Sequence, residues 1–412
     1  MDERAAGRLV GDFLSRRDLP EARLAKLSPA DWECLAEEAQ RFKVGALLHR
    51  EIKARNLPPE LVPVEVRNRF RNEYRDLALR NTRLFIDAAT VIKAMADSQL
   101  PVMALKGLSL AKSVYGDIAL RPMSDVDLLV KEEDLLRAGR ILLTLGYTQH
   151  YPAWESLLKF YHHLPAFMNK SGTKIELHWT IVTPDSPIRV DVDGLWERAC
   201  PIEVDTVAAR AFSPEDLFLH LCLHACFHLE TGLDLIPLCD LAGLMNRKLD
   251  WQIVLERAAR WGGTKCVYLM LLLVRELLGA APPDAILAEM KPDDYRAGFL
   301  DQALDQIFKV SASSQVLGIR VGKLSQLAKA RGIKGKLVTL LAVAFPSREY
   351  LASIYPVSVT SPKIFLCYGF RLGRLIARYT PVLARLFRRD PAVIEAVHRE
   401  HRVSAVCNWV YS

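Results

Sequence analysis

The sequence contains no apolar run long enough to cross a lipid bilayer. Its longest runs, residues 267–274 and 337–345, fall well short of the roughly 20 residues that a membrane-spanning helix needs, and each predicts a buried helix. The first residues, Met-Asp-Glu-Arg, include no apolar stretch of the signal-peptide type. We therefore expect a cytoplasmic protein without a membrane span.

A disulfide framework and low-complexity tracts are also missing. The eight cysteines are scattered in hydrophobic settings without the dense spacing of a secreted disulfide scaffold, so we expect them to be reduced core residues. Half of the residues are hydrophobic and a quarter are charged, which excludes a mainly disordered chain. Because 412 residues exceed the size that a single core usually reaches, two or three packed units are expected.

The hydrophobic pattern changes twice along the chain. Residues 1–98 and 206–412 show the apolar spacing of helices, including a capped helix start at Ser213. Residues 99–205 hold the strand candidates, which are the segments 102–105, 124–130 and 173–181. The pattern predicts an α+β protein that is mainly helical overall, with a small β-sheet core between a helical N-terminal region and a helical C-terminal region.

Two aspartates, Asp125 and Asp127, lie at the start of the predicted strand at 124–130. Residues i and i+2 of a strand point to the same side, roughly 6 to 7 Å apart, so both carboxylates can face one pocket. Two anions in this arrangement repel each other unless cations lie between them, and oxygen ligands favour Mg²⁺ or Mn²⁺. We interpret the pair as a metal site for phosphoryl chemistry, where metals stabilise the attacking and leaving oxygens at phosphorus.

Other residues supply the remaining groups of such a site. Glu176, on another predicted strand, would complete the metal site and help to deprotonate an acceptor hydroxyl. Gly107 lets the backbone approach a phosphate closely, and amides at the start of the following helix point toward anions. The side chains that we expect to hold the triphosphate are Lys106, Ser109 and Arg121.

Simpler interpretations of these acids exist. Asp125 and Asp127 could be ordinary turn or capping residues, but uncompensated charge at the mouth of a buried sheet is costly. A second Asp-x-Asp motif, Asp191 and Asp193, could be the metal motif of a nucleotide-sugar glycosyltransferase. No apolar strand follows this motif, and Asp193 directly precedes a helix-like segment, so helix capping is favoured.

Three segments of the middle part carry a family resemblance. They are Leu105-Lys-Gly-Leu-Ser-Leu-Ala111, Leu120-Arg-Pro-Met-Ser-Asp-Val-Asp-Leu-Leu-Val130 and Ile175-Glu-Leu-His-Trp179. Together they resemble the bacterial family of uncharacterised nucleotidyltransferases, which is placed in the DNA polymerase β-like nucleotidyltransferase superfamily. The resemblance implies a small mixed β-sheet nucleotidyltransferase core. By position, Gly107 matches the motif glycine, the Asp-x-Asp pair matches the metal-binding acids, and Glu176 matches the third acid.

The chain departs from the superfamily pattern at the motif serine. Leu108 occupies the position after the glycine where the superfamily usually has serine, and Ser109 comes one position later. Phosphate binding could therefore differ, with Lys106 compensating, or the enzyme could accept an unusual donor.

Several histidines are candidates for the surroundings of the site. His220, His224 and His228 are spaced by four residues and share one helical face. A separate metal site is conceivable there, but the sequence has neither an adjacent His-Asp dipeptide nor a Cys-x-x-Cys pair. We expect these histidines to lie between the helical region and the sheet, with His224 and His228 near the substrate cleft. His178 shares a strand face with Glu176 and is a candidate outer partner of the metal ligands.

Two further features leave alternatives open. His162 and His163 could flank the pocket or lie in a surface turn. The net charge of +7 is a mild excess that suits a nucleotide or a polyanion. The basic stripe Arg371, Arg374 and Arg378 could contact RNA, acidic lipid headgroups or an acidic protein. A solvated face is favoured over nucleic-acid binding, because few aromatic residues alternate with these charges.

Together these features predict a nucleotidyltransferase that uses Mg²⁺ or Mn²⁺. It would transfer a nucleotidyl group from an NTP, expected to be ATP, to an unidentified acceptor and release pyrophosphate. The same site could instead direct phosphotransfer to a peptide, protein or small molecule. A catalytically silent nucleotide-binding scaffold is a third alternative, which the presence of all three acids disfavours.

Overall fold

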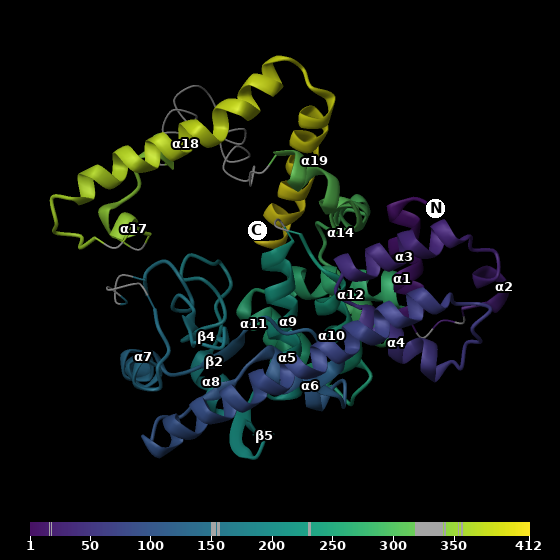
Figure 1. The fold of residues 1–412 in the computed structure, drawn as a ribbon. Coiled ribbons are helices and arrows are strands. Elements are labelled where there is room, and N and C mark those ends of the chain that lie inside the picture. Colours follow the sequence, from purple (N-terminus) through teal and green to yellow (C-terminus); the bar gives the residue numbers. More distant parts are fainter. Residues whose placement is uncertain are drawn as a thin grey trace.

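The computed structural model describes residues 1–412 except 16, 18, 150–153, 155–156, 230–231, 318–340, 342, 353 and 356. The protein is a mainly helical α+β structure with a six-stranded mixed sheet, which confirms the predicted fold class. Figure 1 shows a helical body beside the sheet region, and an arm that contains α17 (Arg348–Ala352) and α18 (Ile364–Phe387) extending from it. Among the described residues, no helix is long and apolar enough to cross a membrane.

The N-terminal part of the chain is helical, as predicted. Its helices are α1 (Glu3–Leu14), α2 (Glu21–Leu24), α3 (Pro29–Arg41), α4 (Gly45–Ala54) and α5 (Val64–Asp97). Local chemistry sets their starts: Ser28 and Asp31 form a reciprocal capping box at α3, with a proline at its first position. The 34-residue helix α5 packs Phe70 in the helical body and Leu84 to Met95 under the sheet, so it connects the two regions.

The sheet has the strand order β3-β4-β2-β1-β6-β5. The strands are β1 (Met103–Ala104), β2 (Val126–Leu129), β3 (Phe167–Met168), β4 (Lys174–His178), β5 (Cys200–Val204) and β6 (Val207–Ala211). Strand β2 pairs in parallel with β4 and antiparallel with β1, while β1 pairs in parallel with β6. Short helices connect the strands: α6 (Lys106–Ser113), α7 (Leu135–Thr144), α8 (Val192–Glu197) and the 3₁₀ turns Ile118–Leu120 and Glu132–Asp134.

The sheet continues past residue 205, where the sequence pattern predicts a return to helix. Strand β6 lies within the segment 206–412 and pairs antiparallel with β5 through a turn in which Asp205 has a φ of 53°. The alanine-rich sequence of β6 favours a helix by propensity alone. Its pairing with β5 and β1 overrides that preference.

Where the structure describes it, the C-terminal part has only helices as regular elements from Pro214 onward. Its helices before the arm are α9 (Pro214–His228), α10 (Leu235–Met245), α11 (Trp251–Trp261), α12 (Thr264–Leu278), α13 (Asp284–Glu289) and α14 (Gly298–Leu317). The hydroxyl of Ser213 accepts a hydrogen bond from the amide of Asp216 and caps the start of α9, as predicted. After the arm, α19 (Pro391–Val410) returns to the body, where Trp409 packs 4.9 Å from the ring of Phe299.

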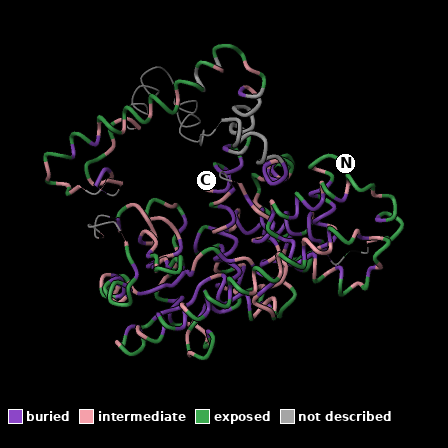
Figure 2. Tube along the Cα trace, viewed as in Figure 1, coloured by how far each residue is buried: buried purple, intermediate pink, exposed green. Residues whose placement is uncertain are grey.

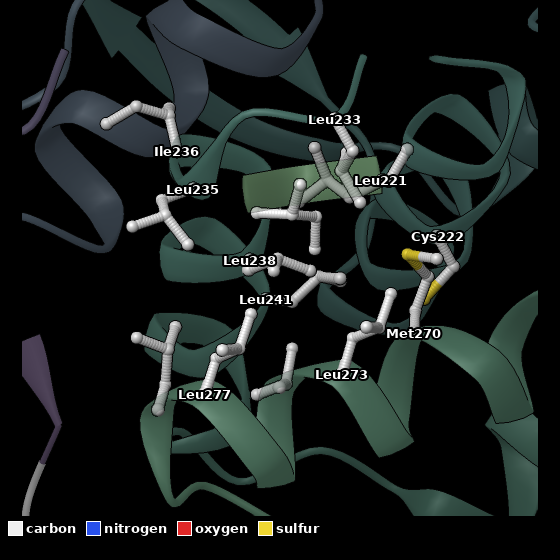
Figure 3. Packing of buried hydrophobic residues seen from close by; sticks show 14 of the residues in the cluster. Leu221, Cys222, Leu233, Leu235, Ile236, Leu238, Leu241, Met270, Leu273 and Leu277 are labelled. Carbon is white, nitrogen blue, oxygen red and sulfur yellow. The ribbon is translucent and has the colours of Figure 1, made fainter. Parts of the chain in front are cut away.

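Helices from both ends of the chain share one hydrophobic core, and a second core lies under the sheet. Figure 3 shows the centre of the first core, where α9, α10 and α12 pack through side chains such as Cys222, Leu238 and Leu273. The predicted buried run 267–274 lies within α12 and is buried. All eight cysteines are free thiols, as predicted, but only five are buried. The prediction of core positions is wrong for Cys34, Cys200 and Cys239, which are half-buried.

The second apolar run, 337–345, does not match its prediction where the structure describes it. Residues 337–340 and 342 lie outside the described residues. Leu341 and Phe345 are both about half exposed, so the prediction of a buried helix is wrong at these positions.

Candidate active site

Strand pairing brings the predicted acids together. Strands β2 and β4 are parallel, and their register pairs Asp127 with Glu176, so the two side chains are neighbours on one face of the sheet. The next pair on that face is Leu129 with His178, which places His178 beside Glu176. Asp125 directly precedes β2 and is half-buried. One face of the sheet therefore presents Asp127, Glu176 and His178 as neighbours, and Asp125 lies just before this part of β2.

A compact set of potential metal ligands is formed by Asp127, Glu176 and His178. Their ligand atoms all lie within 4.8 Å of one another. The Nε2 atom of His178 is 2.9 Å from Oδ1 of Asp127 and 3.8 Å from Oε2 of Glu176. The sequence predicts His178 as an outer partner and Asp125 as a ligand, whereas the compact set includes His178 and not Asp125. Asp125 precedes the first paired residue of β2, so the strand ladder does not fix its position.

The electrostatics of these groups favour a bound cation. Burial and the charge of Asp127 raise the pKa of Asp125, and burial together with the nearby aspartates raises the pKa of Glu176. Burial opposes ionisation of Asp127, but the charge of Lys106 and the hydrogen bond from His178 outweigh it and hold its pKa well below the usual range. A divalent cation would relieve the repulsion among the carboxylates, so these residues fit such an ion.

Lys106 and Gly107 begin α6 next to the acids. The Nζ atom of Lys106 lies 3.2 Å from Oδ1 of Asp127, and its backbone φ of 40° is in the left-handed region that non-glycine residues rarely adopt. The start of α6 directs its first amides outward from the helix, and Ser109 is buried within it. The structure thus places Lys106 beside Asp127, and Gly107 and Ser109 follow it in the first turn of α6.

Gly107 has a steric role that the sequence does not indicate. A Cβ atom there would lie 2.5 Å from the sulfur of Met123 and 2.9 Å from Nη1 of Arg121. Arg121 cannot retreat freely because its guanidinium is bonded to Asp240. Glycine therefore allows α6 to approach the loop that leads into β2.

Gly107→Ala should lower the free energy of unfolding by about 1 to 3 kcal/mol, because the added methyl group overpacks this contact. The urea midpoint measures the loss. In a Met123→Ala background, which has its own cost from the lost core side chain, Gly107→Ala should cost less than it does in wild type, since the closest neighbour is then shorter. A Gly107→Ala single variant as stable as wild type would show that the contact is loose.

Arg121 lies in a buried ion pair. Its Nε and Nη2 atoms bond both carboxylate oxygens of Asp240 in α10 at 2.7 to 3.1 Å, and the hydroxyl of Tyr115 donates to the same carboxylate at 2.7 Å. Helix α5 holds the backbone of this loop, because Asn81 donates to the carbonyl of Arg121. The sequence-based expectation directs Arg121 at the triphosphate, whereas the structure commits most of its guanidinium to Asp240.

Histidines surround the carboxylates on the side of α9. His163 has its Nδ1 atom 3.8 Å from Oε2 of Glu176, and its ring is 5.0 Å from that of His178. His162 lies 5.5 Å from the ring of His178 and 6.1 Å from that of Phe227, which belongs to α9. The sequence leaves His162 and His163 undecided between pocket and surface turn. An isolated bridge between His163 and His178 places them at the site, and no spacing signal could reveal that pairing.

The face of α9 predicted from the four-residue spacing is present. His224 lies 6.1 Å from His220 and 4.5 Å from His228 between ring centres. The charge of Lys106 contributes to lowering the pKa values of both His220 and His224, after burial as the main cause. His220 and His224 therefore lie within electrostatic range of Lys106, and His220 is buried.

The buried histidines should make the fold less stable in acid. Burial lowers the pKa of His178 to about 4 and that of His162 to about 2, and it lowers the pKa of His220 well below its usual range. The ordinary pKa of histidine is about 6.5. Below this pH the histidines of the unfolded chain bind protons that the buried histidines of the folded chain do not, so the free energy of unfolding falls as the pH drops. Each such histidine contributes at most about 1.4 kcal/mol per pH unit.

We expect a lower urea midpoint near pH 5 than near pH 7.5, and a smaller difference in His220→Leu. All other acid-labile groups are present in both proteins, so the difference between wild type and His220→Leu reports the contribution of His220 alone. An unchanged pH dependence in that variant would contradict the assignment of His220 as a buried neutral histidine.

The second Asp-x-Asp motif caps a helix. The carboxylate of Asp191 accepts a hydrogen bond from the amide of Gly194 at 2.9 Å and caps the start of α8. Capping is the predicted role, but the capping residue is Asp191 and not Asp193, which lies inside the first turn. A metal-site interpretation of this motif has no geometric support in the described residues.

Comparisons with known proteins supply the reaction class. No curated protein and no solved structure matches the chain. Residues 28–279 match the protein family described as "Uncharacterised nucleotidyltransferase". This match covers more than half of the chain and includes the sheet, the carboxylate site and the α9 histidines. The chain therefore belongs to this nucleotidyltransferase family.

Proposed function

We propose that the chain transfers a nucleotidyl group from an NTP, with ATP as the expected donor, to an acceptor hydroxyl and releases pyrophosphate. The observation that carries the proposal is the parallel pairing of β2 with β4, which places Asp127, Glu176 and His178 in one compact set beside the start of α6. Family membership supports the reaction class. The bacterial origin and the DNA polymerase β-like superfamily remain part of the proposal.

The proposed cofactor is Mg²⁺ or Mn²⁺. Asp127, Glu176 and His178 would hold it, with Asp125 completing the coordination when the triphosphate is present. Two carboxylates and one imidazole suit Mn²⁺ at least as well as Mg²⁺, because imidazole is a poorer ligand for the harder ion. When bound, the cation would neutralise charge on the triphosphate oxygens and on the leaving pyrophosphate.

The chain's own groups complete the proposed reaction. Lys106 would move from Asp127 to a phosphate oxygen, and the amides of Gly107 and the next residues of α6 would bind the same group. Glu176, whose pKa is raised by burial, would accept the proton of the acceptor hydroxyl. The ring of His163, whose Nδ1 atom lies 2.8 Å from the carbonyl oxygen of Leu164 and 3.8 Å from this carboxylate, would pack beside it.

Arg121 enters the proposal as a positioning residue. Its ion pair with Asp240 fixes the loop that leads into β2, and its Nη1 atom lies where the first turn of α6 passes. The sequence predicts that Arg121 binds the triphosphate. We propose that only its Nη1 atom, which does not bond Asp240, could bind a phosphate oxygen.

The experiment that tests the proposal follows two labels. The chain is incubated with Mn²⁺, a bacterial extract as the source of acceptor, and ATP that is labelled at either the α or the γ phosphate. Nucleotidyl transfer predicts that only the α label enters a product and that the γ label leaves as pyrophosphate. Transfer of the γ label to a product would contradict nucleotidyl transfer and establish phosphotransfer. ATP binding without any turnover in the same extract would favour the scaffold alternative.

A further inference from the structure

Helix α18 exposes a large apolar face. Five bulky apolar side chains of this helix are at least 59% exposed, namely Phe365, Leu366, Phe370, Ile376 and Phe387. Figure 1 shows α18 extending along the arm, away from the sheet and the helical body. Figure 2 shows that most of its described length is exposed or half-buried. A contiguous exposed apolar surface of this kind marks a site of interaction.

The exposed residues of α18 gather on one side of the helix. Phe365, Leu372 and Ile376 follow one another at intervals of seven and four residues, and Leu366 and Phe370 are four apart on the adjacent row. The opposite side is occupied by buried residues such as Ile364 and Cys367, which pack against α17. The helix therefore has one face for the arm and one face without a partner in the described residues.

The segment that contains α18 is strongly basic. Residues 306–389 carry 15 lysines and arginines against one acid, Glu349, a net charge of +14. Because the whole chain carries +7, the remaining residues sum to −7. The basic excess of this protein thus belongs to one segment, and the catalytic body is acidic. This asymmetry is hidden in the mild charge of the full sequence.

Arginines border the apolar face of α18, and the helix contains no acid. Arg374 and Arg378 are exposed, and among the described residues neither forms an ion pair. They continue the row of Leu366 and Phe370 at four-residue intervals, so they lie beside the apolar face. Arg371 differs, because its guanidinium donates to the carbonyl of Val343 at 3.0 and 3.1 Å and so connects α18 to the segment before α17.

We propose that α18 binds the surface of an anionic lipid bilayer, lying in the plane of the headgroups. The apolar face would enter the acyl boundary while Arg374 and Arg378 contact lipid phosphates. The aliphatic side chains Leu366, Leu372 and Ile376 favour a bilayer over a nucleic acid, because base stacking uses aromatic and arginine planes. Charge complementarity selects anionic lipid over a second copy of this equally basic helix.

The test is co-sedimentation of the full chain with phosphatidylcholine vesicles that contain either none or about 30 mol% phosphatidylglycerol. The wild type should bind the anionic vesicles, and binding should weaken as salt rises. Arg374→Gln and Arg378→Gln should each weaken binding roughly fivefold, since a basic residue near the surface contributes about that factor. Phe370→Asp with Ile376→Asp should weaken it at least about tenfold by removing the buried apolar area.

Leu79→Asp is the matched control, because Leu79 is 75% exposed on α5 and lies outside the arm. It should bind anionic vesicles as wild type does, and far-UV circular dichroism establishes that each variant is folded. Equal binding of wild type and the Arg374→Gln variant would overturn the proposal. The proposal would also be contradicted if the wild type bound neither kind of vesicle but bound single-stranded RNA. Formation of a wild-type dimer that Phe370→Asp dissociates would contradict it as well.

Discussion

Asp127→Asn should reduce pyrophosphate release by roughly 10³-fold. Asp127 contacts Lys106 at 3.2 Å and His178 at 2.9 Å and belongs to the compact ligand set with Glu176. Replacing its carboxylate by an amide removes one negative ligand and several kcal/mol of charge stabilisation in the transition state. Since about 1.4 kcal/mol corresponds to tenfold in rate, the loss should reach this size. Steady-state assays with each of the four NTPs, Mn²⁺ and the extract that supplies the acceptor measure it.

The matched control for this variant is Asp191→Asn. Asp191 belongs to the other Asp-x-Asp motif of the chain, and asparagine caps helices about as well as aspartate. Its activity and urea midpoint should stay near those of wild type. If both variants lost activity to a similar extent, the structural distinction between a ligand, Asp127, and a helix cap, Asp191, would be contradicted. Unchanged activity in Asp127→Asn would remove the carboxylate site from the reaction.

Asp240→Ala should lower the free energy of unfolding by about 3 to 5 kcal/mol, the largest stability effect that we expect. Asp240 is 1% exposed and accepts hydrogen bonds from Arg121 and Tyr115. Without its carboxylate, the guanidinium of Arg121 is left buried and uncompensated. The loss is read from the urea midpoint at constant slope.

Two comparisons separate this effect from a general sensitivity to charge removal. Lys93→Ala breaks the exposed pair with Asp97 and should cost no more than about 1 kcal/mol. The double variant Arg121→Met with Asp240→Leu should recover much of the lost stability, because apolar side chains of similar volume replace a buried pair well. A cost for Asp240→Ala as small as that for Lys93→Ala would contradict the buried ion pair.

The sequence alone indicates which acids are candidates for the site. Asp125 and Asp127 precede an apolar strand, and Glu176 lies in an alternating one, so period-two spacing alone indicates which side chains share a strand face. The same spacing assigns His178 to the face of Glu176. The sequence could not show that β2 and β4 pair in parallel with Asp127 opposite Glu176, because register depends on the partner strand. That register brings His178 into the ligand set.

The features that the sequence does not predict depend on contacts between distant residues. Arg121 and Asp240 are 119 positions apart, and neither residue carries a local signal for its partner. An exposed arginine and a buried one look alike in a sequence, which is why the sequence pattern assigns Arg121 to phosphate binding. Similarly, the alanines of β6 favour helix until pairing with β1 is known.

Binding of Mn²⁺ to the purified chain, followed by the electron paramagnetic resonance signal of the free ion, tests the assignment of the site most directly. The wild type should bind Mn²⁺, and Glu176→Gln and His178→Gln should each weaken binding by at least about tenfold, while Asp191→Asn should not change it. Equal Mn²⁺ affinity in wild type, Glu176→Gln and His178→Gln would contradict a metal centre on β2 and β4.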